Sequence, residues 1–197
     1  TTLMPGPTES AWWDPTGSVS GFRGSGTGGG VSTYFAQTTT PWQATTAWQL
    51  QNSSNRQRLV PDIAVNGDPG TGEQVFLRST GSPGGWTQVG GTSMSAPLAA
   101  AMLTDLQIAH GTQASFALGN IAPNLYGAGS SSVRDVLNGS NGVYSASVGY
   151  DLTTGLGVPM WSHLQSALFG APSITAPALT KSHTVPVSVT APPGMHY

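Results

Sequence analysis

The sequence contains no cysteine, which excludes disulfide bonds, thiolate catalysis and zinc sites with cysteine ligands. Charge is also scarce: 7% of the 197 residues are charged, with six Lys and Arg, eight Asp and Glu, and a net charge of -2. Six scattered basic residues do not make a surface for nucleic acid. Neither a long apolar span nor a run of charge indicates contact with a membrane.

The low charge also bears on where the protein works. A surface rich in serine, threonine and glycine suits an extracellular or acidic setting, because few carboxylate pairs are lost on protonation. The first ten residues have no basic segment followed by an apolar core, so no signal peptide is visible. The chain is then either cytosolic or a mature piece whose targeting segment lay upstream, and we expect a secreted protein.

Length and composition predict a folded chain with one principal domain. A chain of 197 residues is large enough to enclose a single core, and 38% hydrophobic residues with six tryptophans are typical of folded proteins. The segment 171–197 is rich in Pro, Thr, Ser and Val. We expect residues 1–170 to form the domain, and 171–197 to be a linker or the first strand of an appended β domain.

Local patterns indicate the order of elements along the domain. They predict a Gly/Ser-rich loop over 14–33, short strands over 58–65 and 75–79, turns over 67–74 and 81–86, a helix over 97–110, a helix end or turn over 120–127, and a last helix over 159–170. The alanines and leucines of 97–110 predict a helix that is buried on most of its circumference.

The stretch "GGTSMSAPLAAAM" (90–102) delivers a serine from a glycine-rich turn to the start of a helix. At that place a serine hydroxyl is exposed beside a backbone N–H and at the positive end of the helix dipole, which suits a nucleophile. Gly90 and Gly91 would let a substrate carbonyl approach the backbone, and Pro97 fits a first helical turn. The alternative is that Ser93 or Ser95 is only a helix N-cap.

A second group of residues has the composition of a cation site. Asp135 and Val136 are followed, across a Gly/Ser-rich loop, by Ser147, Gly149 and Asp151 at alternate positions. Two carboxylates and several carbonyls that project from an extended segment can surround a hard cation such as calcium. From the residues alone, a loop stabilised by Asx turns is an equal alternative.

Several motifs, in order, resemble those of the sedolisins, the acid-active serine-carboxyl peptidases. The serine motif "GGTSMSAP" is shared by subtilisins and sedolisins, and the surrounding residues favour the second family. These are "TTL" at the start, Glu9 with Trp12, "GGGVS" (28–32), Phe35 with "PWQ" (41–43), "RLVPDIAV" (58–65), "GDPGTG" (67–72) and "NIAPNLYG" (120–127). The resemblance covers roughly residues 1–168.

The resemblance implies a fold, a nucleophile and a cofactor. The fold is α/β and subtilisin-like, with a mostly parallel central sheet flanked by helices, of which this chain is the C-terminal part. Ser93 is the nucleophile, and its own N–H is one oxyanion donor. A calcium ion is implied, with these ligands: Asp135, the carbonyls of Val136, Ser147 and Gly149, and Asp151.

The chain departs from the family pattern in its general base. Sedolisins activate the serine with a Glu and an Asp one helical turn apart and stabilise the oxyanion with a further Asp, and all three precede the matched region. Glu9 and Asp14 are five residues apart in a loop, and we interpret Asp62 and Asp68 as structural. The histidines also have structural interpretations, at a helix end, on a surface helix and in the tail: His110, His163, His183 and His196.

The resemblance therefore predicts an acid-active endopeptidase or tripeptidyl-peptidase that acts on polypeptides through an acyl-enzyme. It works once a complementary N-terminal chain, or the N-terminal part of the same protein, supplies the base pair and the oxyanion Asp. Two alternatives remain open: an inactive pseudopeptidase, and a calcium-binding scaffold or adhesion module. A serine-directed phosphonate distinguishes the first hypothesis from the others, because only an activated serine is labelled.

Overall fold

The computed structural model describes residues 8–18, 21, 23–36, 40–44, 57–109 and 118–169, and the backbone of 173–175 and 188–190. The first half contains β1 (Trp13–Asp14), β2 (Ser25–Gly26), β3 (Gly30–Ala36), the 3-10 turn η2 (Pro41–Gln43), β4 (Gln57–Val60), η3 (Pro69–Thr71), β5 (Glu73–Leu77) and β6 (Gly85–Val89). The second half contains α2 (Thr92–Ala109), α3 (Ala122–Gly127), β7 (Val133–Arg134), β8 (Val158–Pro159), α4 (Trp161–Phe169), β9 (Ser173–Thr175) and β10 (Ser188–Thr190).

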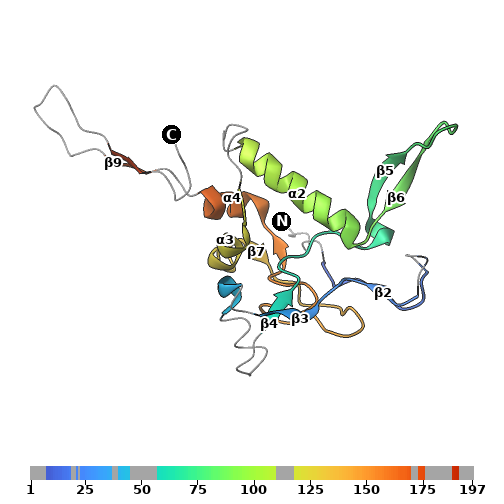
Figure 1. The fold of residues 1–197 in the computed structure, drawn as a ribbon, viewed down its shortest axis with the longest axis horizontal. Coiled ribbons are helices and arrows are strands. Elements are labelled where there is room, and N and C mark those ends of the chain that lie inside the picture. Colours follow the sequence, from blue (N-terminus) through green and yellow to red (C-terminus); the bar gives the residue numbers. More distant parts are fainter. Residues whose placement is uncertain are drawn as a thin grey trace, which may run out of the picture.

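Every sheet in the described residues has two antiparallel strands: β1 with β2, β3 with β4, β5 with β6, β7 with β8, and β9 with β10. The mostly parallel central sheet expected from the sequence is not present among them. In Figure 1 the β5–β6 hairpin projects from the body next to one end of α2, and α4 lies near the other end. The described strands therefore pair locally and do not form a common central layer.

The core lies between the C-terminal half of α2 and the two shorter helices. Leu106 of α2 packs with Leu125 of α3 and with Leu164, Leu168 and Phe169 of α4. Leu164 and Phe169 are almost fully buried, as expected for large apolar side chains at the centre of a domain. This helical corner is the main apolar cluster of the described residues.

Helix α2 differs from its prediction in where it begins and in how much of it is buried. It begins at Thr92, five residues before the expected start, and Leu106 is its one buried residue. Ile108 is 66% exposed, and Ala96, Ala100 and Ala101 are also exposed. An alanine-rich helix has the composition of a central element, but the described part of the chain covers only one end of it.

Other elements differ from their predicted bounds in modest ways. Strand β3 begins inside the expected Gly/Ser loop, and β6 occupies residues expected to be a turn and the segment after it. The expected strand 58–65 ends at Val60, and residues 61–66 belong to no strand, with a bend at Asp62. The helices expected near 120–127 and 159–170 are present as α3 and α4, and Gly170 lies outside the described residues. None of the described helices has the length and hydropathy of a membrane span.

A polar network around Asp62 connects β4, η2 and α3. The Asp62 carboxylate forms an ion pair with Arg58 and accepts a hydrogen bond of 2.9 Å from the Tyr126 hydroxyl. Gln43 donates to the same hydroxyl (2.6 Å) and to the Leu59 carbonyl (2.9 Å). Asp62 thus has the structural role expected for it, through contacts that reach well beyond its own turn.

Tyr126 and Tyr150 border this network. The Tyr150 hydroxyl donates to the Pro61 carbonyl at 2.7 Å. Burial raises the pKa of both phenols above their usual range, and the neighbouring Asp62 charge acts in the same direction. A hydrogen bond from Gln43 opposes the shift at Tyr126 but does not cancel it.

These shifts predict a loss of stability in alkali. A tyrosine in the unfolded chain loses its proton near pH 10, whereas the folded state retains it to higher pH. The stabilisation is therefore fully present below about pH 10 and is lost as the pH rises beyond it. Urea unfolding between pH 8 and 11.5 measures this loss, and Tyr150→Phe should make it shallower. An equal slope in the variant would contradict the assignment.

Candidate active site

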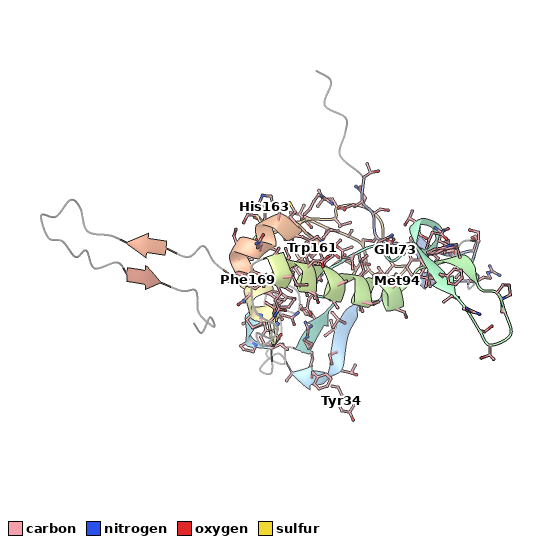
Figure 2. All side chains as sticks on the ribbon, turned by 90° about the horizontal axis from the view of Figure 1, so that it is seen from above. Tyr34, Glu73, Met94, Trp161, His163 and Phe169 are labelled. Atoms are coloured by element: carbon pink, nitrogen blue, oxygen red, sulfur yellow. The ribbon has the colours of Figure 1, made fainter. Side chains whose placement is uncertain are left out.

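Ser93 lies in the first turn of α2, directly after the Gly90–Gly91 pair. Its side chain is exposed, and within the described residues no hydrogen bond engages its hydroxyl. N–H groups in the first turn of a helix have no intrahelical acceptor, so the Ser93 N–H is also available. Figure 2 shows the next residue, Met94, at the end of α2 nearest Glu73 and the β5–β6 hairpin.

Neither serine of the motif caps the helix. The residue before α2 is Gly91, whose carbonyl accepts hydrogen bonds from the N–H groups of Met94 (2.9 Å) and Ser95 (3.2 Å). Gly91 has φ of +84°, a conformation that favours glycine. The N-cap alternative for Ser93 and Ser95 is therefore wrong in this structure, because the capping position belongs to Gly91.

Ser95 instead ties the helix to the preceding loop. Its hydroxyl donates to the carbonyl of Asn66 at 2.9 Å, and the Gly91 N–H donates to the carbonyl of Gly67 at 2.6 Å. A Cβ at Gly90 would lie 2.5 Å from the Cα of Pro69, so a side chain there would displace the loop. Gly90 is thus needed for packing against η3, a reason that the motif alone did not supply.

Pro97 lies one turn deeper in α2 than predicted. Because the helix begins at Thr92, Pro97 is inside it and occupies the position four residues after Ser93. A proline has no N–H, so the Ser93 carbonyl lacks its usual intrahelical donor. The turn that carries the candidate nucleophile is therefore not closed by the ordinary helix bond at this carbonyl.

The carboxylates that could have served as a base have structural partners. Glu9 forms a two-pronged ion pair with Arg134, with 2.7 Å between Arg134 Nε and Glu9 Oε2. Buried Asp14 accepts from the Gly17 and Ser18 N–H groups. Asp68 accepts from the Gly70 N–H at 2.8 Å. These roles agree with the interpretation that none of them replaces a Glu/Asp base pair.

The histidines do not meet Ser93 in the described part of the chain. His163 is exposed on α4, as expected for a surface helix, and Figure 2 shows it beside Trp161 at the end of the molecule away from Met94. His110, His183 and His196 lie outside the described residues. Within the described residues, no histidine is therefore placed to act as the base of a subtilisin-type active site.

A large open cavity of about 810 Å³ lies beside the nucleophile turn. One wall is the side of α2 that carries Ser95, Leu98 and Ala99, and another is formed by Pro61 and residues 63–68. Trp12 and its neighbours form a third wall. The indole N–H of Trp12 is buried without a partner in the described residues.

The predicted calcium ligands come together in one loop region. Asp135 Oδ2 accepts from the Gly149 N–H at 2.7 Å, and Asp151 Oδ2 accepts from the Ser147 N–H at 3.0 Å. Asp135 Oδ1 is buried and has no hydrogen-bond partner in the described residues. The carbonyls of Val136, Ser147 and Gly149 also accept no hydrogen bond there. These free oxygens have the chemistry of a hard-cation site.

Asp151 has the hydrogen bonds expected from the alternative interpretation, a loop stabilised by Asx turns. Its Oδ1 accepts from the N–H groups of Thr153 (2.9 Å) and Thr154 (2.8 Å), and the Thr154 hydroxyl contacts both carboxylate oxygens. An Asx-type turn is thus present at Asp151. The described residues contain no group of three or more acidic, His or Cys side chains that could hold a metal. A cation would be held chiefly by the Asp135 carboxylate and backbone carbonyls.

Two contributors to these sites were not identified from the sequence. Asn66 supplies the carbonyl that holds Ser95, and Thr154 satisfies Asp151. The only sequence signal was the Asn-Gly turn at 66–67 and the threonine pair at 153–154, which do not reveal long-range partners.

Substitution of the two serines separates their roles. Ser95→Ala removes a hydrogen bond and should lower the free energy of unfolding by about 0.5–1 kcal/mol. Ser93→Ala removes a hydroxyl without a partner in the described residues and should change it by less than about 0.5 kcal/mol. Chemical denaturation of both variants measures the difference, and the reverse order would contradict the geometry.

Comparison with known proteins places these observations in a family. No family model matches the chain. Kumamolisin from Bacillus sp. (strain MN-32) is 33% identical over 175 residues, which are 86% of this chain and 29% of kumamolisin. Sedolisin from Pseudomonas sp. (strain 101) is 34% identical over 138 residues, 66% of this chain and 21% of sedolisin. The chain thus spans less than a third of the length of these relatives.

A solved structure agrees with the sequence relatives. Pseudomonas sedolisin, a serine-carboxyl proteinase in complex with two molecules of pseudo-iodotyrostatin, matches with a TM-score of 0.65 and 30% identity. The match covers 81% of this chain and 40% of that one. This likeness supports the α/β fold class expected from the sequence. The chain belongs to the sedolisin family and corresponds to a C-terminal portion of its members.

Proposed function

We propose that this chain is the nucleophile-bearing part of a secreted serine-carboxyl peptidase that hydrolyses peptide bonds in polypeptides at acid pH. It is an endopeptidase or a tripeptidyl-peptidase. The observation that carries the proposal is the exposed Ser93 hydroxyl in the first turn of α2, with its own N–H free beside it. The relatives named sedolisin and tripeptidyl-peptidase support this class of activity.

In the proposed reaction, Ser93 Oγ attacks the carbonyl carbon of the scissile peptide bond and gives its proton to a carboxylate. The oxyanion that forms accepts a hydrogen bond from the Ser93 N–H, at the positive end of α2. Collapse of this intermediate breaks the C–N bond, and the leaving amine takes the proton back. Water then attacks the acyl-enzyme ester, which releases the acid product and restores the serine.

The base comes from outside this chain's described residues. Glu9, Asp14, Asp62 and Asp68 are engaged in structural contacts, which supports a Glu/Asp pair and an oxyanion Asp in a complementary N-terminal portion. A carboxylate works as base and acid near its own pKa, about 4 for an ordinary carboxyl. This is the reason to propose activity in acid, near pH 3–5.

A calcium ion would stabilise the loop behind the site. The proposed ligands are Asp135, the carbonyls of Val136, Ser147 and Gly149, and Asp151. The buried, unpartnered Asp135 Oδ1 supports this assignment, because an isolated buried carboxylate oxygen is costly unless a cation or a donor meets it. The ion would neutralise that oxygen and fix the loop, with no role in bond cleavage.

Active-site titration tests the peptidase proposal. The protein purified from its natural source is treated with a serine-directed phosphonate at pH 4 and digested for peptide mass spectrometry. We expect one adduct on Ser93, its loss in Ser93→Ala, and its retention in Ser95→Ala. If Ser93 stays unlabelled while the protein is folded, the chain is a pseudopeptidase or a calcium-binding scaffold.

Calcium titration tests the cation site. A ligand at 100 times its Kd stabilises the folded state by about 2.7 kcal/mol, so calcium should raise the melting temperature. Asp135→Asn should abolish the rise, whereas Asp105→Asn, at an exposed position on α2, should leave it intact. An equal rise in all three proteins would contradict the assignment.

A further inference from the structure

The chain contains three Asn-Gly pairs, at 66–67, 138–139 and 141–142. In such a pair the backbone nitrogen of the glycine can attack the amide carbon of the asparagine side chain, because glycine has no side chain to obstruct the approach. The reaction needs a side-chain amide that is free to turn toward that nitrogen. The hydrogen bonds around the three asparagines therefore decide which pair can react.

Two of the three side-chain amides are held by hydrogen bonds. Asn66 donates to the Thr71 carbonyl at 2.6 Å and accepts from the Thr71 hydroxyl at 2.9 Å. Asn141 is 9% exposed, and its Oδ1 accepts from the N–H groups of Val143 (3.0 Å) and Tyr144 (2.8 Å). At both sites these bonds must break before the ring that precedes the loss of ammonia can form.

Asn138 differs from both. It is exposed, and its side chain has no hydrogen bond among the described residues. The Gly139 N–H also has no acceptor within that part of the chain. The fold requires this glycine, because Gly139 has φ of +89° and a Cβ on it would lie 2.7 Å from the carbonyl oxygen of Ala11. The backbone contact with Ala11 thus keeps a reactive Asn-Gly pair at an exposed position.

We propose that Asn138 is a site of spontaneous deamidation, a modification that is independent of any peptidase activity. The Gly139 nitrogen attacks Asn138 Cγ, the bond from Cγ to the side-chain nitrogen breaks, and ammonia leaves with the Gly139 proton. Water then opens the cyclic succinimide. Hydrolysis of its Cγ–N bond gives aspartate, and hydrolysis of the bond to the former main-chain carbonyl gives isoaspartate. Water is the only co-reactant.

The isoaspartate product changes how the segment around Ala11 is attached to the rest of the chain. The Asn138 carbonyl accepts from the N–H of buried Ala11 at 2.8 Å. In isoaspartate this carbonyl becomes part of a carboxylate and one more carbon enters the main chain, so the acceptor is displaced. The segment then depends more on its other attachments, such as the ion pair of Glu9 with Arg134. That pair is partly exposed and contributes little by itself.

Peptide mapping of aged protein tests the site, with the other two pairs as internal controls. The protein purified from its natural source is incubated in mildly alkaline buffer, and mass spectrometry with fragmentation follows aspartate and isoaspartate at each asparagine. Asn138 should react at least about tenfold faster than Asn66 and Asn141, whose hydrogen bonds must first break. In concentrated urea the three rates should become similar. Equal rates in the folded protein, or a ranking that persists in urea, would overturn the proposal.

A matched pair of threonine variants tests why Asn66 reacts more slowly. Thr71→Val removes the hydroxyl that bonds Asn66 Oδ1 and retains the main-chain carbonyl. It should therefore speed deamidation of Asn66 and leave the rate at Asn138 unchanged. Thr104→Val removes an exposed hydroxyl on α2 and should change neither rate. An unchanged rate at Asn66 in Thr71→Val would contradict protection by hydrogen bonds.

Melting temperature separates the effect of the main chain from that of the charge. Aged protein is fractionated by chromatography, and the isoaspartate form should melt about 2–4 °C lower because the hydrogen bond from Ala11 is lost. Asn138→Asp adds the same charge without lengthening the main chain, so it should melt with the unmodified protein. Equal melting of the isoaspartate and unmodified forms would overturn the role given to the Ala11 attachment.

Discussion

The hydrogen-bond network around Asp62 holds the segment that lines the cavity and supports the start of α2. The Asp62 side chain meets its near neighbour Arg58 and the distant Tyr126, and its carbonyl accepts from Leu156, so two distant parts of the chain converge on one residue. Burial lowers the pKa of Arg58, but its hydrogen bond and charge interaction with Asp62 outweigh burial and raise that pKa. The Arg58 guanidinium is therefore held in its charged form beside the Asp62 carboxylate.

The segment that follows Asp62 is hydrogen-bonded to the nucleophile turn. Residues 63–65 line the cavity beside α2, and Asn66 and Gly67 then hold the start of α2 through Ser95 and Gly91. The polar network and the serine motif lie far apart along the chain, and the hydrogen bonds of Asn66 and Gly67 connect them in space.

Much of the local structure could be predicted from the sequence. The alanine-rich run predicted a helix over 97–110, which is present but begins at Thr92, and the apolar segments 58–65 and 75–79 predicted strands that overlap β4 and β5. The family motifs identified the peptidase class, which the relatives support. These features are encoded within a few residues of one another, where composition and turn chemistry are decisive.

Features that depend on distant partners could not be predicted. Gly90 is required by Pro69, and Asp151 is satisfied by Thr154, neither of which is implied by a motif. The burial expected for α2 was wrong. A high content of alanine and leucine shows that a helix is suited to a buried position, but it does not show which residues pack against the helix. The position of Pro97 adds a mechanical consequence. Because Pro97 supplies no N–H to the Ser93 carbonyl, the hydrogen bonds of Ser95 and Gly91 to the 66–67 loop are additional attachments of this turn, and the loop shares with the helix in orienting the nucleophile.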